Sequence, residues 1–96
     1  MSTTDPANFS LAAILESPAA GPLAAELQNL RGRPLVIAGD AVSRISSLCM
    51  QVLLSADLTW KADGISFCIA APSEALQEAA RILGLNDGQL AMGSAA

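Results

Sequence analysis

Short apolar runs alternate along this chain with segments in which apolar residues recur at helical spacing. The apolar runs are 9–15, 35–38 and 65–70, and the helical segments are 23–30, 46–61 and 73–83. Runs of four to eight residues predict strands, and spacings of three and four predict helices. Strands that alternate with helices form parallel crossover units. The sequence therefore predicts an α/β fold, with a small, mostly parallel or mixed sheet of about four strands and helices packed on it.

One domain accounts for the whole chain. Its 96 residues suit a single core, and 52% hydrophobic residues are enough to fill it. We expect 1–7 to be a flexible tail, 8–88 to be the domain, and 89–96 to be a short edge strand or a flexible tail. The continuous apolar run at 35–38 predicts a strand that is buried on both faces.

Charge and hydropathy bear on the class of partner. The net charge of −4 argues against a nucleic-acid surface, which needs clustered lysine and arginine. No apolar run approaches the ~18 residues of a membrane span, so we expect no membrane insertion. The N-terminus does not resemble a secretion signal. We therefore expect a cytoplasmic protein in which Cys49 and Cys68 are reduced and buried.

Catalytic chemistry has little support in this sequence. There is no histidine, which is the commonest general base and metal ligand. Two cysteines without other soft ligands do not make a zinc site, and no phosphate-binding loop or nucleophile elbow occurs. Cys49, near a helix N-terminus, is the one candidate nucleophile. We predict a binding module that is not an enzyme and has no catalytic residue, cofactor or metal.

The predicted helix 46–61 carries apolar residues on two sides. At about 100° per residue, one broad stripe is suited to lie on the sheet; it contains Leu48, Cys49, Val52, Leu53, Ala56 and Trp60. Met50, Leu54 and Leu58 form a narrower stripe on the opposite side. That side of a helix in a two-layer domain faces water. The narrow stripe is therefore either a docking face, for another protein or a second copy, or a surface that a neighbouring helix or the C-terminal residues cover.

Two adjacent serines open the same helix. One hydroxyl is enough to cap it, by accepting a hydrogen bond from a free N–H of the first turn. The other has a functional reading, phosphorylation, because a helix N-terminus tolerates a phosphate of about −1.5 to −2 charges. Ser47 and Ser46 are thus the candidate phosphoacceptors. A phosphate there would lie near Met50 and could block a partner without unfolding the domain.

The segment LVIAGDAVSRISSLCMQVLLSA, from Leu35 to Ala56, resembles the centre of STAS domains, the fold of bacterial anti-sigma-factor antagonists. Their pattern is a hydrophobic strand, a short loop and then Ile-Asp-Ser-Ser-Gly-Leu. Ile45 matches the isoleucine, Ser46 the aspartate, and Ser47 the serine that accepts phosphate in that family. Residues 63–85, DGISFCIAAPSEALQEAARILGL, resemble the later strand and helix, so that the likeness covers about 9–86. Two acids are replaced, the strand-end aspartate by Ala38 and the loop aspartate by Ser46.

The resemblance implies a regulatory protein that acts by binding a kinase-like regulator of the anti-sigma type, with Ser47 as the switch. We expect the binding surface to comprise Asp40, which is close to the missing strand-end acid, together with Met50, Leu54 and Leu58. The chain is most similar to short STAS proteins, such as the accessory subunit of lipid-asymmetry transporters and proteins associated with chemotaxis. The alternative is therefore a constitutive accessory subunit of a transporter or chemotaxis complex, without a phosphorylation switch.

Overall fold

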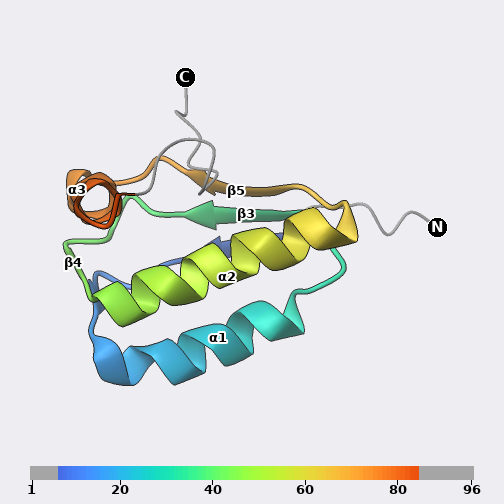
Figure 1. Cartoon of the computed structure of the whole chain (residues 1–96), viewed down its shortest axis with the longest axis horizontal. Coiled ribbons are helices and arrows are strands. Elements are labelled where there is room, and N and C mark those ends of the chain that lie inside the picture. Colours follow the sequence, from blue (N-terminus) through green and yellow to red (C-terminus); the bar gives the residue numbers. More distant parts are fainter. Residues whose placement is uncertain (1–6, 85–96) are drawn as a thin grey trace.

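The computed structural model describes residues 7–84 and has an α/β architecture with parallel strands, as predicted (Figure 1). The main sheet has the order β1-β3-β5, with β1 at Ala7–Ser10, β3 at Leu35–Ala38 and β5 at Phe67–Ala70. Its register aligns Phe9 with Ile37 and Ile37 with Ile69. A second parallel pair joins β2 (Ile14–Leu15) to β4 (Arg44–Ile45). The short edge strand or flexible tail expected at 89–96 lies outside the described residues.

The helices connect these strands. They are the 3-10 turn η1 (Ser17–Ala19), α1 (Ala20–Asn29), α2 (Ser47–Asp63) and α3 (Glu74–Ile82). In Figure 1, α1 and α2 run side by side along the sheet. Helix α3 lies across the end of the sheet at which β3 and β5 finish, next to β4. None of the helices within residues 7–84 has the length and apolar character needed to cross a membrane.

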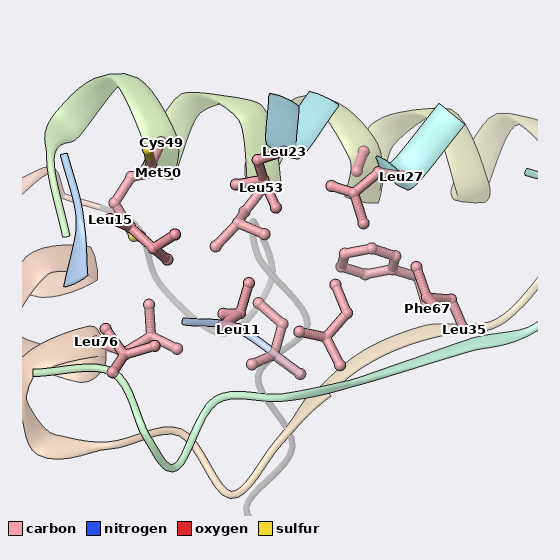
Figure 2. Packing of buried hydrophobic residues seen from close by; sticks show 14 of the residues in the cluster. Leu11, Leu15, Leu23, Leu27, Leu35, Cys49, Met50, Leu53, Phe67 and Leu76 are labelled. Atoms are coloured by element: carbon pink, nitrogen blue, oxygen red, sulfur yellow. The ribbon is translucent and has the colours of Figure 1, made fainter. Parts of the chain in front are cut away.

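The core fills the space between α1, α2 and one face of the sheet. Figure 2 shows Leu23 and Leu53 on the helix side of the core above Leu11, and Leu27 above Phe67. In β3 and β5, buried residues alternate with half-buried ones. The expectation that 35–38 is buried on both faces is therefore wrong. The two helices that connect the three strands pack on the same face, so only every second residue of each strand enters this core.

Two other sequence predictions need correction. The run 9–15 is not one strand, because it divides into β1 and β2 with a bend between them. Ala7, expected in the flexible tail, is part of β1, where its N–H donates to the carbonyl of Pro34 over 2.7 Å, and it is buried. The alanines and the lone Phe9 give this segment little periodicity, so its pattern did not reveal the bend.

Polar contacts connect the C-terminal ends of α1 and α2. Arg31, just after α1, donates two hydrogen bonds to the carboxylate of Asp63 over 2.9 and 3.0 Å. The Trp60 indole N–H donates to the carbonyl of Arg33 over 2.7 Å, and its ring lies 5.7 Å from that of Phe67. The hydrogen bonds from Arg31 hold the pKa of the Asp63 carboxyl below its ordinary value of 3.8.

This pair predicts a pH dependence of stability. Because the folded-state pKa of Asp63 is lowered, its contribution is fully present above the unfolded-state pKa and is lost as the pH falls through the folded-state value. Asp63→Asn should thus have a lower urea midpoint than the native chain at pH 6, and the difference should become smaller as the pH is lowered towards 2. The control is Glu26→Gln, which removes an exposed carboxylate of α1. A difference between native and Asp63→Asn that is as large at pH 2 as at pH 6 would contradict the assignment.

The loops after β3 and β5 are joined through Gly39. Its N–H donates to the carbonyl of Ala70 over 3.0 Å, and its carbonyl accepts from the N–H of Ser73 over 3.0 Å. A Cβ at this glycine would lie 2.7 Å from Leu76 Cδ2 and 3.1 Å from Ile69 Cγ2. The close approach of the two loops therefore requires glycine, which has no side chain, at position 39.

Gly39→Ala is expected to lower the free energy of unfolding by about 1–3 kcal/mol, because the added methyl group overpacks the contact with Leu76. Gly21→Ala provides the matched control, since a Cβ at this position of α1 meets no atom within 4 Å. That control should leave stability unchanged or raise it, because alanine favours a helix over glycine by up to about 1 kcal/mol. Urea denaturation of both variants checks the prediction, which fails if Gly39→Ala matches the control.

Candidate functional site

The N-terminal end of α2 is capped by the first of the two serines. Ser46 has an extended backbone, with φ −78° and ψ 159°, and its hydroxyl oxygen accepts a hydrogen bond from the N–H of Cys49. That bond is 3.2 Å long. Ser46 is half-buried. The helix thus begins at Ser47, and Ser46 is its N-cap, in the geometry that serine favours.

Ser47 is the first residue of α2 and is exposed. Its side chain makes no hydrogen bond with any other residue in the described part of the chain. The first-turn N–H groups of a helix lack intrahelical acceptors, and the helix dipole places partial positive charge at this end. The Ser47 hydroxyl is accordingly accessible at a position where an added negative charge is tolerated.

The small β2–β4 pair fixes this end of α2 in place. The N–H of Ser46 donates to the carbonyl of Leu15 over 2.8 Å. The Cys49 thiol is buried and lies 3.4 Å from the carbonyl oxygen of Glu16. An ion pair at 3.0 Å connects Arg44 of β4 to the Glu16 carboxylate at the surface. These contacts hold the start of the helix against the segment that follows β2.

The structure divides the predicted binding residues between several environments. Asp40 is exposed in the turn that follows β3. In Figure 1, β3 ends at the same end of the molecule at which α2 begins. Leu58 is exposed, with 57% of its surface accessible, and Leu54 is half-buried. Met50 has no accessible surface. The prediction that Met50 lies on an outer docking face is wrong, since its side chain packs in the core beside Leu15 (Figure 2).

The cause is the rotation of α2 about its axis. The buried face contains Cys49, Met50, Leu53, Ala56, Asp57 and Trp60. Leu48, expected on the sheet, is instead 47% exposed. Apolar residues surround this helix, so periodicity left its orientation open. Contact with both α1 and β5 then selects the face that contains Leu53 and Trp60.

Burial of Asp57 is the unexpected consequence of this rotation. Its side chain is fully buried, and its carboxylate lies 3.0 Å from the ammonium group of Lys61, one turn further along α2. The Lys61 side chain is 49% exposed, so the pair links a buried charge to the surface. The ion pair with Lys61 offsets part of the cost of burying this carboxylate.

Sequence reasoning missed two exposed apolar residues at this end of the molecule. Leu48 lies in the first turn of α2, next to Ser47. Ile14 of β2 is 58% exposed and pairs in register with Arg44. A usable signal existed for Leu48: with Ser46 as the cap, the first turn projects Ser47 and Leu48 away from the face that holds Leu53. No signal marked Ile14, because β2 is only two residues long.

The start of α2 and the loops around it expose both polar and apolar side chains. Within residues 7–84, no group of three or more cysteine, aspartate or glutamate side chains is arranged to hold a metal ion. The exposed polar groups at this end include the Ser47 hydroxyl, the Asp40 carboxylate and the Arg44–Glu16 ion pair. The exposed apolar residues there are Leu48 and Ile14. No protein-family model and no curated protein matches this sequence.

The two serines are expected to differ in their effect on stability. Ser46→Ala removes the cap and should lower the free energy of unfolding by about 1 kcal/mol. Ser47→Ala removes a hydroxyl without a partner, so its effect should stay within about 0.5 kcal/mol. Urea unfolding followed by far-UV circular dichroism measures both. Equal losses for the two variants, or a larger loss for Ser47→Ala, would contradict the assignment of Ser46 as the cap.

Proposed function

We propose that the chain is a regulatory protein-binding module of the anti-sigma-factor-antagonist type, and that it docks its partner through the end of the molecule where α2 begins. We define this docking end by Ile14, Asp40, Ser47 and Leu48. The observation that carries the proposal is the position of Ser47, which is exposed at the first residue of a capped helix and has an unengaged hydroxyl. It supports the role that the resemblance to STAS domains gives to this serine.

The apolar part of the proposed surface consists of Leu48 and Ile14. Both are more than two-fifths exposed although they are large aliphatic residues, and a partner that covers them would gain roughly 25 cal/mol for each Å² of apolar surface buried. Leu58 lies ten residues further along α2 than Leu48, which is roughly 15 Å at 1.5 Å per residue. We therefore place Leu58 and Leu54 outside the docking end.

A phosphate on Ser47 would act locally. It would add about −1.5 to −2 charges beside Leu48, where a docked partner excludes water. Desolvation of that charge opposes docking, whereas the free N–H groups of the first turn stabilise the phosphorylated helix. Phosphorylation would therefore release the partner and leave the fold intact, as a regulatory switch requires. The partner proposed is a kinase-like regulator of the anti-sigma type, in the cytoplasm of a bacterium.

The second candidate function is a constitutive accessory subunit, of a lipid transporter or a chemotaxis complex, that has no phosphorylation switch. One observation favours it. Ser46 stands where the STAS pattern has an aspartate, and its hydroxyl is used to cap the helix rather than to shape the loop for a kinase. In both candidates the protein acts by binding rather than by catalysis.

Phosphate and partner binding can be tested together in the native cells. Intact-mass and peptide spectra should show an added phosphate on Ser47 under some growth conditions, and not on Ser46. The partner that co-purifies with the native chain should be lost with Ser47→Glu and with Leu48→Asp, and retained with Ser47→Ala. Leu58→Asp is the matched control, because it adds the same charge to an exposed leucine of the same helix, and it should retain the partner.

The outcomes separate the two candidates. Loss of the partner with Leu48→Asp, together with an unmodified Ser47 in all conditions, would support the accessory subunit and exclude the switch. Retention with Leu48→Asp and loss with Leu58→Asp would move the binding surface to the middle of α2. Retention with both would show that the exposed side of α2 does not bind this partner.

A further inference from the structure

A cavity of about 140 Å³, open to solvent on one side, lies between α1 and α2, away from the docking end. Its lining is mixed, since Val52 and Trp60 contribute hydrocarbon surface and Gln28, Arg31, Ser55 and Thr59 contribute polar groups. A closed apolar cavity of ~150 Å³ in another protein holds one benzene molecule. The open cavity between these helices has a similar volume, so a single six-membered ring fits within it.

The polar groups of the cavity are available to a ligand. The side chains of Gln28, Ser55 and Thr59 make no hydrogen bond to another residue in the range 7–84. Arg31 is held in place because two of its N–H groups bond to Asp63. An arginine has five N–H groups, so the edge of the guanidinium that faces away from Asp63 can still donate.

Charge decides between a neutral and an anionic ligand. The positive charge of Arg31 is balanced by Asp63 at 2.9 Å, and the chain as a whole has a net charge of −4. This field does not attract an anion. The guanidinium and the two hydroxyls are donors, and they fit the carbonyl oxygen of a neutral group. The amide of Gln28 offers both a donor and an acceptor, which fits an amide.

We propose that the cavity between α1 and α2 is a binding site for a small, neutral, single-ring aromatic amide or a similar cyclic amide. The ring occupies the volume beside Val52 and Trp60, and the carbonyl accepts from Thr59 and from the free edge of Arg31. This site is independent of the docking end, because its residues come from α1 and from the middle and C-terminal part of α2.

Trp60 makes the test direct. It is the only tryptophan, the sequence has no tyrosine, and its side chain lines the cavity. When Trp60 is excited at the red edge of indole absorption, the fluorescence of the full-length chain therefore reports whether a ligand occupies the cavity. Benzamide is the probe, and benzene and benzoate are matched probes that lack the amide or carry a charge. We expect a saturable change with benzamide at a half-saturation on the order of 1 mM, as for ligands of this size. Both matched probes should bind several-fold more weakly.

Two variants and one control locate the site. Ala24→Leu places a larger side chain in the lining and should abolish the response. Ala25→Leu makes the same change at the adjacent exposed residue of α1 and should leave it unchanged. Thr59→Val keeps the shape and removes the hydroxyl, so half-saturation should rise about threefold to tenfold. If Ala24→Leu does not fold, as judged by circular dichroism, Thr59→Val carries the test.

Three results would overturn the proposal. The first is the absence of a saturable change with benzamide up to 20-fold above the expected half-saturation. The second is equal binding of benzamide, benzene and benzoate, which would show that the polar lining does not distinguish ligands by polar group or charge. The third is an unchanged benzamide titration in Thr59→Val and in folded Ala24→Leu, which would place the ligand elsewhere.

Discussion

The packing of α2 is the contact on which the rest of the molecule depends. One side of this helix, from Cys49 to Trp60, is buried against the sheet and α1. This burial fixes the rotation of the helix, and the rotation determines which residues face water. Leu53 and Trp60 enter the core, Met50 and Asp57 follow because they lie on the same side, and Leu48 and Leu58 turn outward. The identity of the exposed serine also follows, because the cap that starts this helix uses Ser46 and leaves Ser47 at the surface.

Much of the fold was predictable, because strands separated by helices restrict the topology to a few arrangements. The alternation gave the fold class and the Leu35–Ala38 strand. Short elements were not predictable, since two residues such as Ile14–Leu15 carry no periodicity. The rotation of α2 was not predictable either. With apolar residues on every side, the sequence permits several buried faces, and tertiary packing selects one.

The same limit explains the outcome for the candidate site. Ser47 could be found because a helix start has a local signature in two serines before an apolar segment. Met50 was placed wrongly because an exposed stripe is a property of the assembled domain. The corrected surface is smaller and lies at one end, where the loops after β1 and β3 converge with the first turn of α2. The phosphate proposed for Ser47 would lie within this surface, next to Leu48 in the chain.

Thiol reactivity measures the orientation of α2, in which Ser47 and Leu48 face outward and Met50 faces inward. In a chain with Cys49→Ala and Cys68→Ser, Leu48→Cys and Met50→Cys introduce single thiols two residues apart in the first two turns. We predict that the thiol at 48 reacts with a soluble disulfide reagent nearly as fast as in the urea-unfolded chain. The thiol at 50 should react at least about a hundredfold more slowly, because it requires opening of the core. Equal rates, or a faster reaction at 50, would contradict the orientation of α2 and the docking end that follows from it.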